Sequence, residues 1–159
     1  MTEMTTENTI YITYIAAAPE QMWAALISSE FITRYFFGRS IESDWKKGSH
    51  WNLRMPDGRV DVNGDVREVN PPRKLVLSWN IALAQERFPE ANVTYEIEPA
   101  GEDVVRLTMT EAHPTPIPAS WLEGGRKGWP MILSGLKSLL ETGKPLRMPT
   151  PMPPKEMKQ

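Results

Sequence analysis

Five stretches between residues 50 and 111 alternate between apolar and polar side chains, and this pattern constrains the fold more than any other feature. A period of two is typical of strands that bury one face and leave the other in water. Most links between the stretches are too short for parallel crossovers, so we expect hairpins in an antiparallel meander. The inward-facing residues are expected to be Trp51, Leu53 and Met55, then Val60, Val62, Gly64 and Val66, then Leu75, Leu77 and Trp79, then Val93, Tyr95 and Ile97, and finally Val105, Leu107 and Met109.

Helical patterns flank this predicted sheet on both sides. Before it, Ile10, Ile12 and Tyr14 recur at every second position and predict a first strand. Two short helices are expected to follow that strand. Pro19 opens the first, because a proline lacks the N–H that has no partner in a first helical turn. Gly38 closes the second.

The last patterned element is a long amphipathic helix. Its apolar residues recur at helical spacing and are Trp129, Ile132, Leu133, Leu136, Leu139 and Leu140. Gly143 followed by Pro145 is typical of a helix end. Because an interior proline costs a helix about 3 kcal/mol, Pro130 either places the helix start near Gly128 or breaks there a helix that begins around Trp121. The glycine-rich residues 124–128 are then expected to form a flexible loop.

These elements predict an α+β fold with a ligand pocket. One long helix and two short ones cannot cover a flat sheet of five or six strands, but they can cover a curved antiparallel sheet wrapped around the long C-terminal helix. Gly64, in the middle of a strand, is typical of such a bend. A cleft between sheet and helix is a common small-molecule site. The residues expected to line it are Trp51, Leu53, Val66, Leu77, Trp79, Tyr95, Leu107, Met109, Trp129, Leu133 and Leu136.

Composition excludes several classes of function. The chain has 159 residues, 40% hydrophobic and 24% charged, with a formal net charge of −2, so we expect neither nucleic acid nor an anionic membrane as a partner. It has no cysteine, which excludes disulfides, thiolate nucleophiles and thiolate metal sites. The polar start and the lack of an apolar run near ~20 residues favour the cytoplasm over secretion or membrane insertion.

The length predicts a single domain, which we place at residues 9–143. Residues 144–159 contain five prolines and are expected to form a flexible tail, because they cannot bury enough apolar surface to become ordered.

Several stretches resemble a known family. They are residues 18–26 (APEQMWAAL), 35–38 (YFFG), 43–49 (SDWKKGS), Asp57-Gly58 followed by Gly64, 70–79 (NPPRKLVLSW) and, most specifically, 128–143 (GWPMILSGLKSLLETG). Together they resemble bacterial proteins similar to the C-terminal domain of the activator of heat-shock-protein-90 ATPase, over about residues 9 to 143. The resemblance implies the helix-grip fold of the START and pollen-allergen-like superfamily.

That superfamily includes lipid carriers, hormone receptors, polyketide cyclases, antibiotic-sequestering proteins and a co-chaperone domain, so the fold alone does not determine the activity. Two departures from the family pattern fall near the expected pocket mouth. Residues 111–114 (EAHP) stand where relatives usually have a threonine–histidine pair leading to a glycine, and residues 115–128 are divergent.

Catalytic motifs are missing from the sequence. There is no zinc helix motif, no phosphate loop and no nucleophile elbow. Glu111 and His113 could share one strand face and, with His50, form a metal site or an acid–base pair, but the alternation places His50 on the outer face. Asp61 and Asp65 are also expected on the solvated face. We therefore assign no catalytic residue, no metal and no cofactor.

The leading hypothesis is a binding protein for a small hydrophobic or aromatic molecule, held in an internal cavity. One alternative is a cyclase or hydrolase on the same fold, with a polar pocket residue such as Tyr95 taking part. The other is a co-chaperone-like interaction domain with a chaperone partner. We expect a monomer or a weak homodimer.

Overall fold

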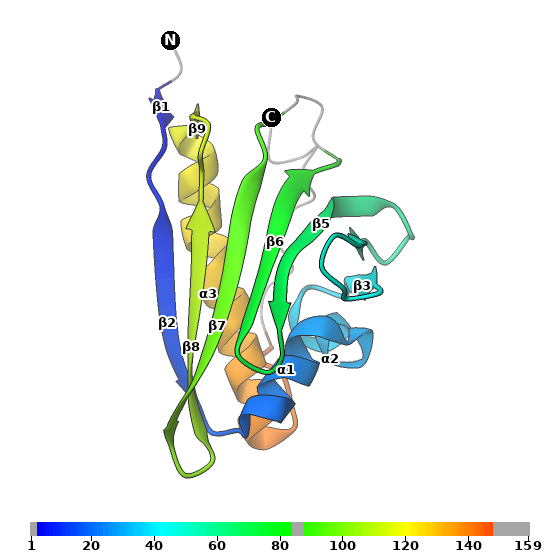
Figure 1. Ribbon diagram of the computed structural model, residues 1–159, viewed down its shortest axis with the longest axis vertical. Coiled ribbons are helices and arrows are strands. Elements are labelled where there is room, and N and C mark those ends of the chain that lie inside the picture. Colours follow the sequence, from blue (N-terminus) through cyan, green and yellow to red (C-terminus); the bar gives the residue numbers. More distant parts are fainter. Residues whose placement is uncertain (1–2, 84–87, 148–159) are drawn as a thin grey trace.

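Seven antiparallel strands form one curved sheet, in the order β2-β8-β7-β6-β5-β4-β3 (Figure 1). The computed structural model describes residues 3–83 and 88–147. The strands of the sheet are β2 (Thr9–Ile15), β3 (Ser40–Ser43), β4 (His50–Arg54), β5 (Val60–Asn70), β6 (Lys74–Ile81), β7 (Ala91–Gly101) and β8 (Val104–Ala112). The short strands β1 (Met4–Thr5) and β9 (Ile117–Pro118) pair with each other apart from this sheet.

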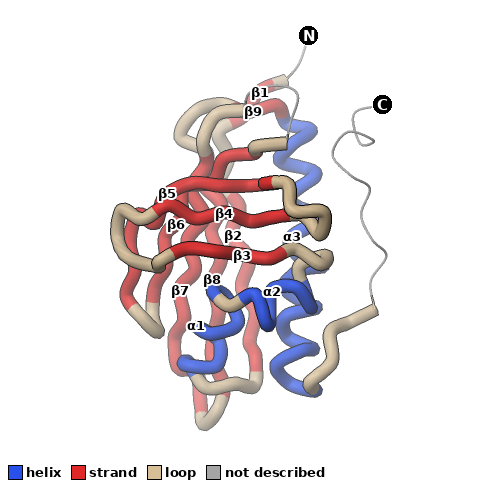
Figure 2. Tube along the Cα trace, turned by 90° about the vertical axis from the view of Figure 1, so that its right-hand side faces the viewer, coloured by secondary structure: helices blue, strands red, loops and turns tan. Residues whose placement is uncertain are grey.

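The helices are α1 (Pro19–Ile27), α2 (Ser29–Tyr35) and α3 (Ala119–Thr142). Figure 2 shows α3 running along the face of the sheet, with α1 and α2 grouped at one end of it. The prediction of an α+β fold, with a curved antiparallel sheet around a long C-terminal helix and two short helices after the first strand, is confirmed. Of the tail predicted at residues 144–159, residues 148–159 lie outside the described part of the chain.

The core fills the space between the sheet and the helices. Its fully buried side chains include Trp51 and Leu53 from β4, Met109 from β8 and Leu136 from α3. Among the described residues, no helix is both long enough and apolar enough to cross a membrane.

The first strand turns its apolar stripe outward. Ile10, Ile12 and Tyr14 on β2 are 61%, 48% and 54% exposed. The opposite face of β2 points into the core, because Ile15 pairs with Val105 and Tyr11 pairs with Met109, both inward-facing residues of β8. The outer stripe is therefore an exposed apolar surface on the edge strand of the sheet.

The long helix begins earlier than expected. α3 is continuous from Ala119, so residues 124–128 are helical and the predicted loop is wrong, as is the predicted break at Pro130. The β1–β9 pair holds the helix start, and the Ala119 N–H donates to the Glu3 carbonyl at 2.8 Å. Leu122 and Trp129 are 3% and 6% exposed, so tertiary packing overrides the poor helix propensity of these turns. Gly143 ends the helix, as predicted, and adopts the left-handed conformation.

Gly64 lets β5 approach β6 closely. A Cβ atom at this position would overlap the Ser78 carbonyl oxygen and lie 2.6 Å from the Ser78 hydroxyl. Ser78 is fully buried, its carbonyl accepts the Trp51 indole N–H at 3.0 Å, and its hydroxyl accepts the Asp65 N–H at 2.8 Å. The glycine therefore preserves a buried junction of three strands.

We expect Gly64→Ala to lower the free energy of unfolding by about 1–3 kcal/mol, because the added methyl group must displace backbone that cannot yield. The control is Gly101→Ala on β7, where a Cβ would lie 3.9 Å from its nearest neighbour. Urea denaturation of both variants checks this. Equal unfolding midpoints for the two variants would contradict the account of Gly64.

Candidate functional site

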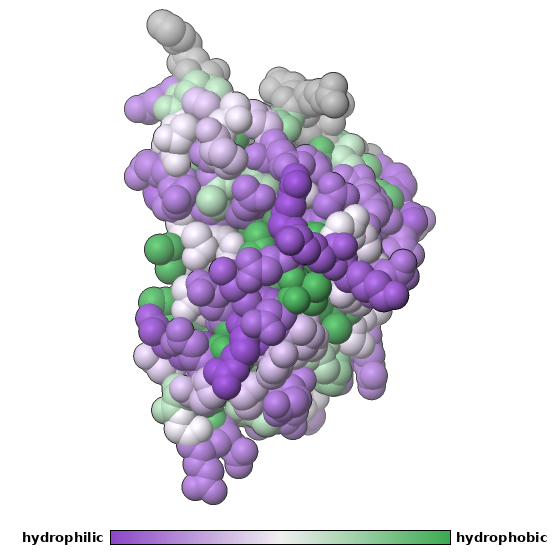
Figure 3. Space-filling model, viewed as in Figure 1, coloured by the Kyte–Doolittle hydropathy of each residue, from purple (hydrophilic) through white to green (hydrophobic). Residues whose placement is uncertain are grey.

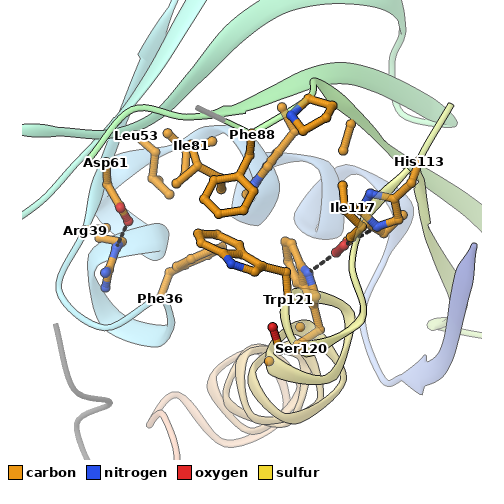
Figure 4. A pocket seen from close by; sticks show the side chains of 18 of the residues that line it. Phe36, Arg39, Leu53, Asp61, Ile81, Phe88, His113, Ile117, Ser120 and Trp121 are labelled. Atoms are coloured by element: carbon orange, nitrogen blue, oxygen red, sulfur yellow. Dashed lines mark hydrogen bonds and ion pairs between the residues drawn. The ribbon is translucent and has the colours of Figure 1, made fainter. Parts of the chain in front are cut away.

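A cavity of about 420 Å³ lies where the first turns of α3 cross the sheet (Figure 4). Its walls come from the residues that follow α2, from strands β4 to β9 and from α3. Its exposed lining residues Ser120 and Gly124 place an opening beside the helix. The lining residues are Phe36, Phe37, Arg39, Leu53, Asp61, Val62, Trp79, Ile81, Phe88, Pro89, Ala91, Glu111, His113, Ile117, Ser120, Trp121, Gly124, Gly125 and Trp129. The unexpected first turns of α3 thus supply one wall.

Aromatic rings make up much of this lining. Trp79 and Trp129 have ring centroids 5.4 Å apart, and Phe36 meets Trp129 edge-on at 5.8 Å. On the α3 side, Phe88 and Trp121 lie in contact with centroids 3.6 Å apart. Such surfaces favour flat, apolar or aromatic molecules, which can stack or pack edge-to-face against them.

One end of the cavity holds a hydrogen-bonded carboxylate. The Trp129 indole N–H donates to Glu111 Oε1 at 2.8 Å, and His113 Nε2 lies 2.9 Å from Glu111 Oε2. His113 is 6% exposed, and its Nδ1 is buried without a partner among the described residues. The alternation of β8 explains the placement, because positions 111 and 113 continue the inward face of Leu107 and Met109.

The charge of Glu111 acts on two neighbouring tyrosines. Burial is the main cause that raises the pKa of Tyr95, and the nearby Glu111 carboxylate raises it further. The pKa of Tyr11 is raised by the same two causes in the same order. Both phenols are therefore neutral at physiological pH.

The other end of the cavity holds an ion pair. Arg39 Nε donates to Asp61 Oδ2 at 2.6 Å, and these side chains are 12% and 11% exposed. Asp61 was expected on the solvated face, and that prediction is wrong. The register between β4 and β5 shifts at Leu53/Arg54, and this irregularity leaves Asp61 without a partner on β4 and turns its side chain inward. Figure 4 shows Arg39 and Asp61 across the cavity from His113.

Three of the eleven residues expected to line the pocket lie on this cavity: Leu53, Trp79 and Trp129. The others pack into the core and are not among the lining residues: Trp51, Val66, Leu77, Tyr95, Leu107, Met109, Leu133 and Leu136. The reason is that side chains fill the space between α3 and the middle of the sheet, so that the cavity occupies only one end of it. His50 lies on the exposed outer face near Asp65, apart from Glu111 and His113.

Several lining residues were not predicted as site residues. Glu111 and His113 were expected on one strand face but were not assigned to the pocket, although the inward alternation of Val105, Leu107 and Met109 continues to both positions. Gly125 was missed because a loop was expected at residues 124–128, and Trp121 was missed because the helix was expected to begin near Gly128 or to break there. Asp61 was missed because of the bulge. Within the described residues, no three histidine, aspartate or glutamate side chains are placed to hold a metal ion.

The chain belongs to the family described as "Activator of Hsp90 ATPase homolog 1-like protein", whose model matches residues 16–141. This agrees with the family resemblance of the sequence. No curated protein matches the chain.

Solved structures share the fold at low sequence identity. Protein MLL2253 from Mesorhizobium loti is 23% identical with a TM-score of 0.73, covering 85% of this chain and 97% of that one. PFC0360w, an HSP90 activator from Plasmodium falciparum, is 22% identical with a TM-score of 0.70, and the match covers 84% of this chain and 96% of that one. The Aha1 dimer from Colwellia psychrerythraea is 18% identical with a TM-score of 0.70, and the match covers 87% of this chain and 98% of that one.

We expect Asp61→Ala to lower the free energy of unfolding by about 3 kcal/mol, because it leaves the guanidinium of Arg39 buried without its counter-charge. Glu68→Ala is the matched control, since the Glu68–Lys74 pair is 50% and 39% exposed and its loss should change the urea midpoint little. A small effect of both substitutions would show that water reaches Arg39 freely.

Proposed function

We propose that this chain is a cytoplasmic binding protein that holds a small, mostly apolar or aromatic molecule in the cavity beside α3. The observation that carries the proposal is the 420 Å³ of space among aromatic side chains, with a hydrogen-bonded polar group at each end. Pockets for small ligands have this size and this mixture of lining groups. The cavity opens beside α3, where its lining residues Ser120 and Gly124 are exposed, so a ligand can enter it from solvent.

The family relation supports the proposal only at the level of the fold, because one fold serves many functions. An enzyme of the cyclase or hydrolase kind has less support. Tyr95, the residue that this alternative would use, is 7% exposed in the core and does not line the cavity.

Native mass spectrometry of the freshly purified protein, compared with its denatured mass, is the direct test. A bound small molecule of defined mass would support a ligand-binding function and indicate the class of ligand. A mass equal to that of the chain, together with no response to a panel of neutral aromatic molecules, would contradict it.

Gly124→Leu should block the cavity without harming the fold. Gly124 lines the cavity, and a Cβ atom there would meet nothing within 4 Å. We expect the affinity for an aromatic probe, 2-naphthol, to fall about tenfold or more, because a leucine at the opening occupies the space of the ligand. Replacing a helix glycine should also stabilise the fold by up to about 1 kcal/mol.

Gly128→Leu is the matched control for that variant. Gly128 lies one turn further along α3 and does not line the cavity, and a Cβ atom at this position would also meet nothing within 4 Å. Isothermal titration calorimetry with 2-naphthol should therefore give the wild-type affinity for Gly128→Leu. Unchanged binding by Gly124→Leu would place the ligand elsewhere.

A second candidate function, protein interaction, is favoured by the apolar stripe of Ile10, Ile12 and Tyr14. Figure 3 shows hydrophobic side chains along the edge of the molecule where β2 lies. We take the partner to be a second copy of this chain. The neighbours of Ile10 and Ile12 on β8 are the uncharged Thr110 and Thr108. The neighbour of Tyr14 is Arg106, whose charge is paired with Glu98, so two stripes can face each other without opposing unpaired like charges. A relative solved as a dimer supports this choice.

Ile12→Lys should weaken such a dimer by placing a charge in its centre, and sedimentation equilibrium over a range of protein concentrations measures this. Val76→Lys is the control, because it adds the same charge on the half-buried outward face of β6, away from β2. A wild-type chain that stays monomeric at all concentrations would contradict the homodimer. Adding purified Hsp90 to the same experiment tests the other partner that the family suggests.

A further inference from the structure

Glu111 is held so that part of its carboxylate stays available to a ligand. Trp129 donates to one oxygen and His113 Nε2 lies against the other, whereas a carboxylate offers about four acceptor positions. The indole N–H can only donate, so Glu111 Oε1 acts as an acceptor in this arrangement. Both contacts also fix the orientation of the carboxylate at the wall of the cavity.

The space next to this carboxylate has been left open by α3. The residue facing it is Gly125, where a Cβ would lie 3.5 Å from Glu111 Oε1 and 3.7 Å from Oε2. A Cβ atom at position 125 would therefore already be in van der Waals contact with both oxygens. A glycine in the interior of a helix is unfavourable by roughly 0.5–1 kcal/mol relative to alanine, and here it leaves room for a group that can hydrogen-bond to Glu111.

The charges around the cavity disfavour an anion. Four of the described lining residues are charged or titratable: Arg39, Asp61, Glu111 and His113. Arg39 is already paired with Asp61 at 2.6 Å. With His113 neutral the four groups carry a net charge of −1, and with His113 protonated they carry zero. In neither state does this lining attract a negatively charged molecule into an apolar space, where an uncompensated charge is costly.

We infer that the polar group of the ligand is a hydrogen-bond donor, a hydroxyl or an amine on an apolar or aromatic body, that binds the free acceptor positions of Glu111. Carboxylates such as fatty acids or aromatic acids are then excluded. This inference rests on the proposed binding function and adds the chemical class of the ligand. His113, which also lines the cavity, helps to orient Glu111 through the contact between its Nε2 and Glu111 Oε2.

Three probes with one ring system test the inference by isothermal titration calorimetry at pH 7. They are 2-naphthol, 2-naphthylmethylammonium and 2-naphthoate. We expect the two donors to bind and 2-naphthoate to bind at least about tenfold more weakly, since a carboxylate facing Glu111 brings like charges together. Equal or tighter binding of 2-naphthoate overturns the inference and leaves the binding function standing. No binding of any probe contradicts the proposed binding of aromatic ligands, and the inference with it.

Glu111→Gln separates a ligand contact from a purely structural network. The amide keeps the shape of the side chain and an acceptor for Trp129, but it removes the negative charge. We expect the affinity for 2-naphthylmethylammonium to fall about tenfold or more, because hydrogen bonds to ionised groups are roughly twice as strong as neutral ones. The preference over 2-naphthoate should shrink by at least the same factor, because the charge that repels 2-naphthoate is removed as well.

Glu98→Gln is the control for the change in net charge, because Glu98 is 60% exposed and pairs with Arg106 outside the cavity. It should bind all three probes as the wild type does. If Glu111→Gln alters the urea midpoint but leaves the order and strength of probe binding unchanged, Glu111 serves the fold alone and the inference is wrong.

Discussion

The packing of the first turns of α3 against the sheet is the contact on which the cavity depends. Residues 119–129 contain two glycines that line the cavity and carry no side chain to fill it, while Leu122 and Trp129 hold the same turns in place. Further along, Leu133 and Leu136 lie in the packed core. The second half of α3 therefore packs into the core, whereas its first half forms one wall of the cavity.

Much of the fold could be predicted from the sequence because alternation reports directly on which face of a strand is buried. Every strand from β4 to β8 follows from such a pattern, and so does the helical spacing after Trp129. The pattern fails where tertiary contacts decide the geometry. Residues 124–130 combine glycines with Pro130, which usually mark a helix boundary, yet the β1–β9 pair and Leu122 keep them helical. The pairing of Met4 with Pro118 is a long-range contact, and local sequence patterns do not predict such contacts.

The candidate site was harder to predict than the fold, for physical reasons that differ among its residues. Glu111 and His113 continue an inward alternation, but whether both face inward depends on how far the strand runs, and β8 ends at Ala112, one residue before His113. Asp61 faces inward because of a bulge, and the position of a bulge depends on how two strands pair. Large apolar residues such as Leu77 and Leu107 gave no indication of whether they fill a core or line a cavity, because burial is the same in both cases.

The glycines of α3 also have a dynamic consequence. Gly124, Gly125 and Gly128 together with Pro130 make residues 119–130 intrinsically poor at forming a helix, so these turns depend on their tertiary contacts for order. A molecule bound in the cavity, as proposed, would add contacts to Trp121 and Trp129 on this segment. Occupancy and local helicity are then thermodynamically linked, so that each stabilises the other. Local unwinding of these turns would open the cavity, and the rate at which a ligand leaves would reflect the local stability of the helix as well as the strength of its own contacts.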